Sequence, residues 1–250
     1  MNKIEDFYLN YLGVNAQELA SGERVFSSDL RGKPESELTC NVHDLIVSVF
    51  NDNLIHSVNE DMLKSYCHLA PRQVSTDLLE LVDDAFFKVC KYRYYWISEW
   101  FRYSTDESHD LTQDVTVLTS SHREMIEARK QVRRGHLFRD RVWEKAYFPL
   151  LLEGRLMAVI RDSKIVSYSS VTYMPFGAAN IAVWTDQEHR KMGYGANCVM
   201  QAVNWCKDNN RIPIYLVSTL NIASIRLAEK LGFNRFASEI RTTVNTSLNR

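Results

Sequence analysis

Residues 181–196 read IAVWTDQEHRKMGYGA, and the fold predicted for the rest of the chain depends on this stretch. It begins with five strand-forming residues, 181–185, passes through a charged turn, 186–191, and reaches Gly193 and Gly195. An amphipathic helix follows, because apolar residues recur at helical spacing at Val199, Ala202, Val203 and Cys206. A strand that enters a helix through a glycine-rich turn predicts a phosphate site. Backbone N–H groups at a helix start lack intrahelical acceptors, and the helix end carries a partial positive charge.

The spacing of the turn excludes two common nucleotide-binding motifs. A Rossmann fingerprint needs a third glycine where this chain has Cys198. A P-loop needs Lys-Ser or Lys-Thr directly after the second glycine, but Ala196 and Asn197 follow Gly195. The motif that remains is Arg190-x-x-Gly193-x-Gly195 between a strand and a helix.

Composition limits the class of protein. The chain has 250 residues, 45% of them hydrophobic and 24% charged, which is typical of one large soluble domain or two small ones. Thirty basic and thirty-one acidic residues leave a net charge of -1, which argues against nucleic-acid or anionic-membrane binding. No signal segment or apolar run of membrane-spanning length is visible, and the five cysteines form no CxxC. We therefore expect reduced thiols, a cytoplasmic location and no metal site.

The first 112 residues predict a separate small α/β domain. Its expected elements are a helix at 4–12, a strand at 42–50 returning at 54–55, and helices at 61–69 (capped by Asn59) and 77–89. Residues 91–103 hold seven aromatics, which favour packing, although base stacking or a substrate pocket is the alternative. The polar stretch 104–114 is the predicted boundary, giving domains 1–112 and 113–250.

The second unit alternates strands and helices. We expect a strand at 115–118, a helix to about 134 opened by a capping box of Ser121 and Glu124, and a helix at 137–147. A hairpin follows, with strands 156–160 and 165–174 joined by the turn 162–164. After the glycine turn and its helix come a strand at 212–218, a helix from Asn221 to Gly232, and a strand at 236–244.

This order, together with three motifs, resembles the GCN5-related N-acetyltransferases (GNAT). The motifs are the Arg190-x-x-Gly193-x-Gly195 turn, Asn221-x-x-Ser224 directly after a strand, and the ending LAEKLGF at 227–233. The extension before residue 113 is similar to that of a GNAT subgroup that includes a zwittermicin-resistance acetyltransferase. The resemblance implies an α/β fold in which a mixed sheet with splayed central strands is flanked by helices, preceded by a smaller α/β domain.

The resemblance also implies acetyl-CoA as acyl donor. The N–H groups of the glycine turn would bind the CoA pyrophosphate, and the strand before it would pair with the pantetheine arm. Two residues at the next helix start would border the cofactor from the opposite side. The cofactor-binding residues so implied are Val183, Trp184, Thr185, Arg190, Lys191, Met192, Gly193, Tyr194, Gly195, Ala196, Asn221 and Ser224. Lys191 and Lys230 are further candidates for phosphate contact.

Three residues are the catalytic candidates: Thr185, Asp186 and Glu188. By resemblance, the Thr185 N–H would stabilise the oxyanion formed at the acetyl carbonyl. Asp186 and Glu188 are the nearby carboxylates that could act as base through a water. The family often places a tyrosine, the acid for the leaving thiolate, where this chain has Ala228. Tyr173, Tyr194, Tyr215 and Ser218 are substitutes that the sequence leaves unranked.

The sequence supports three functional hypotheses. The first is acetyl-CoA-dependent N-acetylation of a small-molecule amine, with an antibiotic-like amine as one candidate and the first 112 residues walling the acceptor cleft. The second is an acyl-CoA-binding regulatory module with little catalysis. The third is acetylation of protein amines, which would need an open, shallow groove. A homodimer is left open.

Overall fold

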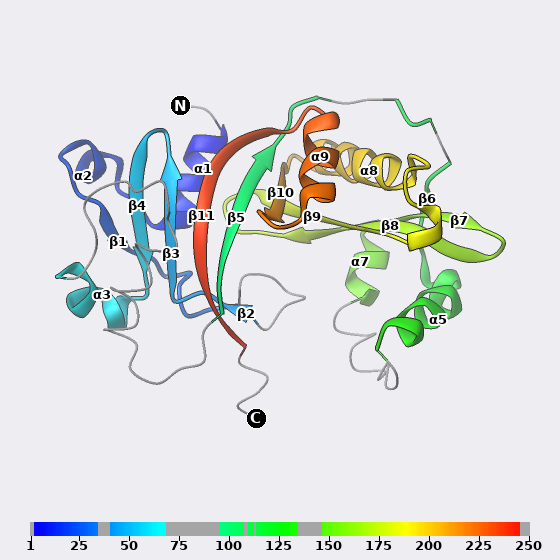
Figure 1. The fold of residues 1–250 in the computed structure, drawn as a ribbon, viewed down its shortest axis with the longest axis horizontal. Helices are drawn as coiled ribbons and strands as arrows, with labels where there is room; N and C mark the ends of the chain where they lie inside the picture. The colour runs from blue at the N-terminus through cyan, green and yellow to red at the C-terminus, as the bar shows by residue number, and fades with distance from the viewer. Residues whose placement is uncertain are drawn as a thin grey trace.

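The computed structural model describes residues 3–34, 41–68, 96–107, 110–112, 114–134 and 147–245. Within these residues eleven strands form one mixed sheet, which runs along the long axis of the molecule (Figure 1). The order across the sheet is β1 (Val25–Ser27), β4 (Asn53–Val58), β3 (Leu45–Phe50), β11 (Asn234–Asn245), β5 (Trp96–Ser104), β10 (Ile212–Ser218), β9 (Ala178–Thr185), β8 (Lys164–Tyr173), β7 (Leu156–Arg161) and β6 (Thr116–Val117). A short strand, β2 (Asn41–Val42), pairs with the end of β11. The predicted fold class, a mixed sheet flanked by helices, is confirmed.

Helices cover both faces of the half of the sheet that contains β7 to β10. On one face lie α8 (Tyr194–Asp208) and α9 (Ile222–Lys230), and on the other lie α5 (Arg123–Arg134) and α7 (Phe148–Leu152) (Figure 1). The other half is covered by α1 (Lys3–Leu12), with α2 (Ala16–Ala20) and α3 (Glu60–Cys67) at its end. No helix in the described ranges is both long and apolar enough to cross a lipid bilayer.

Local sequence signals place most of these elements correctly. Helix α1 ends at Gly13, whose φ of 74° lies in the left-handed region where glycine carries no steric penalty. Asn59 caps α3 by accepting from the Asp61 N–H at 3.1 Å, as predicted. The hairpin of β7 and β8 turns through Asp162 and Ser163 at positive φ. The predicted strands at 42–50, 156–160, 165–174, 212–218 and 236–244 are all present within a few residues.

One predicted helix start is wrong. Ser121 lies inside a short 3-10 helix (Ser120–His122) that leads directly into α5, so it does not cap that helix. The chain enters this turn from Thr119, whose N–H donates to Nδ1 of His122 at 3.0 Å. Histidine here accepts the bond that a glutamate accepts in the usual capping box, which is why the S-x-x-E pattern gave the wrong position.

The strand β5 joins the two predicted units. It precedes the predicted boundary, yet it pairs antiparallel with β10 on one edge and with β11 on the other. Its Phe101 and Tyr103 pack into the core under α8 and α9. The packing interpretation of the aromatic stretch therefore holds for this part of it, while 91–95 lies outside the described residues. The predicted helices at 77–89 and 137–147 also lie wholly or almost wholly outside them.

A buried group of charges connects β5 with β11 and α1. Glu239 accepts from Nε of Arg102 at 2.8 Å and from Nε of Arg241 at 2.5 Å, and none of these side chains is more than 3% exposed. The hydroxyl of Tyr8 donates to the same carboxylate at 2.9 Å. Removing one partner from such a group leaves an uncompensated buried charge, which is strongly destabilising.

Candidate functional site

The site is built where β9 and β10 separate. The two strands pair in parallel at only three positions, Ala178 to Asn180 with Ile212 to Ile214. Beyond these, β9 continues to pair with β8 as far as Thr185, and β10 continues to pair with β5 as far as Ser218. The two strand ends therefore diverge and leave a wedge between them. The splayed central strands that the sequence implied are present.

The backbone of β9 is directed into this wedge at alternate residues. The Gly177 carbonyl accepts the Ile212 N–H from β10, whereas the Asp186 N–H donates to the Val166 carbonyl oxygen in β8. Backbone groups along a strand alternate between its two neighbours. The N–H groups of Val183 and Thr185 therefore point away from β8, toward the side that β10 has left. This is the direction that pairing with an extended ligand needs.

The charged turn after β9 is held by its own side chains. Asp186 caps a 3-10 helix (Gln187–His189) by accepting the Glu188 N–H at 3.0 Å, and His189 Nδ1 lies 3.3 Å from the same carboxylate oxygen. Bonds from His189 and from the Glu188 N–H lower the pKa of Asp186. The chain then reaches Gly193, the N-cap of α8, at φ 82°. Gly193 adopts this left-handed conformation without the penalty that a Cβ brings.

Gly195 lies in the first turn of α8 for a different reason. A Cβ added there would stand 2.8 Å from Oγ1 of Thr185, closer than real Cβ contacts come. The Thr185 hydroxyl is itself fixed by Ser167 Oγ at 2.9 Å. The absence of a side chain thus lets the helix start approach the end of β9, so that helix N–H groups and strand N–H groups face the same space.

That space is a cavity of about 670 Å³, which is in the range of ligand clefts in proteins. Its lining combines the end of β9, the glycine turn, the first turn of α8 and one side of α9. The described lining residues are Val183, Trp184, Thr185, His189, Arg190, Lys191, Gly193, Tyr194, Gly195, Ala196, Asn221, Ala223, Ser224, Leu227 and Lys230. Eleven of the twelve predicted cofactor-binding residues are among them. Met192 is not, and its side chain is largely exposed.

The cavity suits an anionic ligand. Arg190, Lys191 and Lys230 line it, and no acidic side chain is among the described residues that do so. The start of α8 adds a partial positive charge, because the N–H groups of a first helical turn lack intrahelical acceptors. Side-chain cations and backbone donors together form the kind of site that binds a diphosphate.

The predicted catalytic residues divide into two groups. Thr185 lines the cavity, with its N–H directed to the wedge. Asp186 and Glu188 are not among the residues that line it. The Asp186 carboxylate caps the turn and its pKa is lowered, which makes it a weaker proton acceptor than an ordinary aspartate. Glu188 is exposed.

Helix α9 brings a hydroxyl pair to the opposite wall. Asn221 caps α9 by accepting the Ser224 N–H at 3.2 Å, and both residues line the cavity. The Ser224 hydroxyl lies 2.6 Å from the hydroxyl of Tyr215, which extends from β10. Tyr215 is 2% exposed, and burial raises the pKa of its phenol. The protonated phenol of Tyr215 is therefore hydrogen-bonded to Ser224, whose hydroxyl belongs to the cavity wall.

The four substitutes for the missing tyrosine differ in how they reach the cavity. Ala228 is fully buried in the core between α9 and the sheet. Tyr173 hydrogen-bonds Glu153 and lies 6.2 Å from the ring of Trp205, and it does not line the cavity. Tyr194 lines the cavity directly, whereas Tyr215 reaches it through Ser224. Ser218 ends β10, outside the lining.

Asn197 is not among the predicted site residues, although its side chain fixes the glycine turn. Asn197 is buried in α8, donates from Nδ2 to the Gly193 carbonyl at 3.0 Å, and accepts the Thr112 N–H at 2.7 Å. Its position next to a glycine motif is the signal that could have indicated it. Cys198 and Cys206 are buried in the core, as expected, and burial raises the pKa of the first thiol to about 11.

The chain is similar to known proteins in sequence family and in fold. A family model described as GNAT acetyltransferase matches residues 50–238. Among solved structures, an acetyltransferase from the GNAT family of Colwellia psychrerythraea is 13% identical with a TM-score of 0.52, over 78% of this chain and 82% of that one. A GCN5-related N-acetyltransferase from Sphaerobacter thermophilus is 14% identical with a TM-score of 0.49, over 74% of this chain and 64% of that one. The chain thus spans just under two thirds of the Sphaerobacter protein. No curated protein matches the chain significantly in sequence.

Proposed function

The chain belongs to the GNAT acetyltransferase family, and from this premise we propose that it transfers an acetyl group from acetyl-CoA to a primary amine of a small molecule. The observation that carries the proposal is the cavity between β9, the start of α8 and α9. It joins three cationic side chains and the N–H groups of a glycine turn to a strand edge with backbone donors pointing inward.

Acetyl-CoA supplies the acetyl group when it is bound. The glycine turn, Gly193 to Ala196, holds the diphosphate, and Arg190, Lys191 and Lys230 add positive charge around it. The N–H groups of Val183 and Thr185 hold the pantetheine arm by strand-like bonds. These assignments rest on where the residues lie around the cavity.

The reaction needs an oxyanion donor and a proton balance. The Thr185 N–H donates to the acetyl oxygen as the amine nitrogen forms its bond to the carbonyl carbon. When the carbon–sulfur bond breaks, Ser224 gives a proton to the departing thiolate and takes one from Tyr215, and the phenolate regains its proton from solvent through Ser224. The proton that the amine loses goes to water. An alkyl amine with a pKa near 10 costs about 4 kcal/mol to deprotonate at neutral pH, so an assisting carboxylate speeds the reaction. Glu188 is the better candidate, because Asp186 is committed to its turn.

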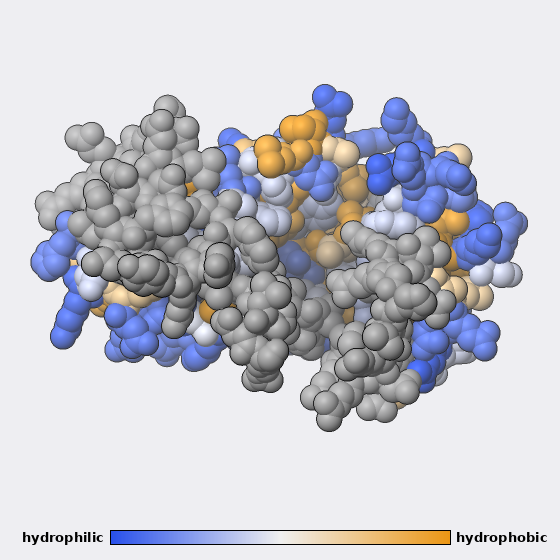
Figure 2. All heavy atoms as spheres, turned by 60° about the horizontal axis from the view of Figure 1, so that its bottom comes forward, coloured by the Kyte–Doolittle hydropathy of each residue, from blue (hydrophilic) through white to orange (hydrophobic). Residues whose placement is uncertain are grey.

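The acceptor approaches from the open side of the wedge. On the face turned forward in Figure 2, hydrophobic residues lie near the middle, and hydrophilic residues lie above and to the right of them. A small amine with an apolar body fits a partly apolar surface of this kind. Peptide amines are the alternative acceptor, and a test panel separates the two.

A second function is favoured by one observation. Ala228 fills the core position where the family often has its catalytic tyrosine. A chain that binds acyl-CoA and regulates a partner needs no such acid. In that case the cavity binds coenzyme A tightly and no acetyl group is transferred.

Release of free thiol from acetyl-CoA distinguishes these functions. The full chain is incubated with acetyl-CoA and a panel of small amines, lysine peptides and no acceptor, and the thiol is followed with a thiol-reactive dye. The proposal predicts amine-dependent release with at least one small amine, accompanied by the mass of the acetylated product. Tight binding of coenzyme A without release supports the regulatory module, and release with peptides alone supports a protein acetyltransferase.

A further inference from the structure

The peptide group between Trp184 and Thr185 has the oxyanion donor on one side and a carbonyl on the other. Its N–H belongs to Thr185 and is directed into the wedge. Its carbonyl belongs to Trp184 and points the opposite way, toward β8, because the peptide is planar and trans. Trp184 is in register with Tyr168, two positions from the bond between the Asp186 N–H and Val166. By this alternation the Trp184 carbonyl accepts the Tyr168 N–H. Whatever else binds this carbonyl acts on the N–H through one peptide.

Ser167 adds a second hydrogen bond to this carbonyl. Its hydroxyl donates to the Trp184 carbonyl oxygen at 3.0 Å. The residue belongs to β8, is fully buried and does not line the acetyl-CoA cavity. Ser167 is also in register with Thr185, and the two hydroxyl oxygens lie 2.9 Å apart. The serine therefore contacts both residues that the peptide joins, without reaching the space that the ligand would occupy.

The directions of these hydrogen bonds follow from the protons available. A serine hydroxyl has one proton to donate, and a carbonyl oxygen can only accept. Because the Ser167 proton goes to Trp184, the Thr185 hydroxyl is the donor in its bond to Ser167. The Cys198 thiol also bonds Ser167, and burial raises its pKa to about 11, so it keeps a proton of its own at neutral pH. A chain of hydrogen bonds therefore runs from the Thr185 hydroxyl through Ser167 to the Trp184 carbonyl.

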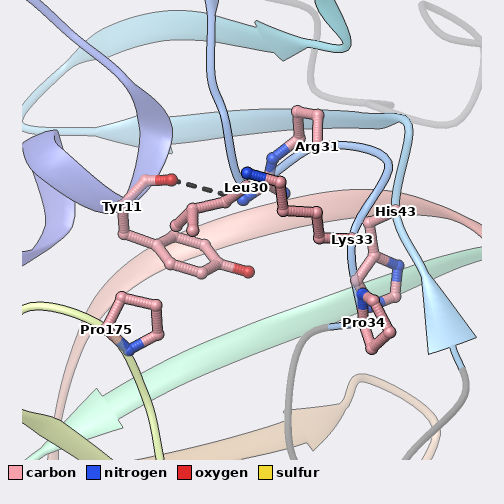
Figure 3. Close-up of a pocket in the computed structure, with 7 residues that line it drawn as sticks. All are labelled: Tyr11, Leu30, Arg31, Lys33, Pro34, His43 and Pro175. Carbon is pink, nitrogen blue, oxygen red and sulfur yellow. Dashed lines mark hydrogen bonds between the residues drawn. The ribbon is translucent and has the colours of Figure 1, made fainter.

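The bond from Ser167 is not needed to satisfy the carbonyl. Figure 3 shows the contrasting case, in which Nη2 of Arg31 donates to the Tyr11 carbonyl oxygen at 3.2 Å, in the last turn of α1. Carbonyl groups in a last helical turn have no N–H partner within the helix, so a side chain takes that place. Trp184 lies instead within the paired part of β9 and receives the Tyr168 N–H. The extra donor at Trp184 therefore calls for another reason.

We propose that Ser167 is a positioning residue for acetyl transfer: it polarises the peptide between Trp184 and Thr185 and so strengthens the bond from the Thr185 N–H to the acetyl oxygen. The inference rests on the proposed function. Hydrogen bonds in a chain strengthen one another by about 10–30% per bond. Removing a whole oxyanion donor costs about 100- to 1,000-fold in kcat. Losing a tenth to three tenths of that effect lowers kcat by about two- to eightfold. Ser167 itself exchanges no proton with the substrate.

Two serine substitutions in the full chain test the proposal by kinetics. Ser167→Ala removes the donor, while the strand pairing of Tyr168 with Trp184 stays. The kcat with the best amine should fall about two- to eightfold, and the dissociation constant of coenzyme A, which has no acetyl carbonyl, should stay within about twofold. Ser104→Ala, which removes another buried hydroxyl that donates to a strand carbonyl, at Pro213, should leave both values unchanged. An unchanged kcat in Ser167→Ala, or an equal fall in Ser104→Ala, would overturn the proposal.

The carbonyl band of bound acetyl-CoA gives a readout that a purely structural role of Ser167 would not move. Acetyl-CoA with an isotope label at the acetyl carbonyl is bound to the full chain without an amine, and infrared difference spectra record its stretch. A weaker bond from the Thr185 N–H should raise the wavenumber in Ser167→Ala and, to a lesser extent, in Ser167→Cys, whose thiol is a weak donor. Ser104→Ala should leave the band in place. A band at the wild-type position in both Ser167 variants would overturn the proposal.

The infrared measurement also separates this proposal from the proposed function, because it needs binding and no turnover. A wild-type chain that binds acetyl-CoA but transfers no acetyl group would contradict the proposed function, and the band would still decide whether Ser167 acts on the acetyl carbonyl. A wild-type chain that binds no acetyl-CoA would overturn both.

Discussion

Gly195 shows how one missing methyl group shapes the acetyl-CoA cavity. The residue needs no unusual backbone conformation, and its requirement is space, because Thr185 Oγ1 occupies the position next to it. The sequence motif identified both glycines as necessary but could not distinguish their reasons. Gly193 is required by its left-handed φ, and Gly195 by the approach of β9.

This distinction predicts a rescue by a second substitution. Gly195→Ala should weaken coenzyme A binding by about tenfold, close to 1.4 kcal/mol, because the new Cβ pushes the helix start away from β9. Thr185→Ala removes the atom that it meets, so the double variant should recover much of that affinity. Calorimetric titration of the four chains measures the coupling. Additive losses would show that the contact with Thr185 is not what Gly195 avoids.

The hydroxyl pair of Ser224 and Tyr215 makes a second prediction for single residues. Tyr215→Phe should lower kcat about 100-fold, while the KM for acetyl-CoA changes little, because the phenol serves only the departing thiolate. The matched control is Tyr103→Phe, which removes another buried tyrosine hydroxyl that contacts α9, at Glu229. Steady-state thiol release with the best amine measures both. A Tyr215→Phe chain with wild-type kcat would exclude the phenol as the proton source.

At the scale of elements, features held by neighbours along the chain were predictable from the sequence, and features held by contacts between distant segments were not. Caps and tight turns depend on neighbours along the chain, so Asn59, Asn221 and the turn at Asp162 were predicted correctly. The start of α5 was misplaced because His122 substitutes for an acidic cap partner. The pairing of Ser224 with Tyr215 joins a helix to a strand, and no local pattern indicates which tyrosine reaches it.

Helix α8 predicts a dependence of stability on pH. Burial raises the pKa of Cys198 to about 11 and that of Cys206 to about 12, from an ordinary value of 9.0. Each thiol has a higher pKa in the folded state than in the unfolded state. The free energy of unfolding therefore has its full value below pH 9 and falls as the pH rises through these values. Between pH 8 and pH 10 the free energy of unfolding should fall by about 1 kcal/mol for each thiol.

Urea unfolding at the two pH values measures this loss. The double variant Cys198→Ala/Cys206→Ala should show a smaller decrease than the wild-type chain, whatever its stability at pH 8. Cys67→Ala, at an exposed position, should keep most of the decrease. An equal decrease in the wild-type chain and the double variant would mean that the two thiols do not titrate on unfolding.

For the whole molecule, the position of β5 determines how the two predicted units relate. A sequence pattern can indicate that residues 96–104 form a strand but not that they insert between β10 and β11. The buried group of Arg102, Glu239 and Arg241 depends on that insertion and was likewise invisible. The polar stretch at 104–114 was predicted from composition as a domain boundary, and that boundary remains a prediction.

The inserted strand predicts that the second unit does not fold alone. A chain of residues 113–250 lacks β5, which leaves the facing edges of β10 and β11 without their hydrogen bonds and Glu239 without Arg102. We expect it to aggregate or to lack a cooperative melting transition, whereas the full chain melts cooperatively. Circular dichroism on both chains checks this. A cooperatively folded 113–250 chain that binds coenzyme A would show that β5 is dispensable.

The most direct test of the account is a calorimetric titration of the full chain with coenzyme A. Its central claim is that the left-handed turn at Gly193 holds the backbone donors that bind the diphosphate. We predict binding in the micromolar range, about -8 kcal/mol, and a loss of at least about tenfold in Gly193→Asp. Gly22→Asp, at another left-handed glycine with open space around it, should bind as the wild-type chain does. No heat of binding to the wild-type chain, or unchanged affinity in Gly193→Asp, would contradict the claim.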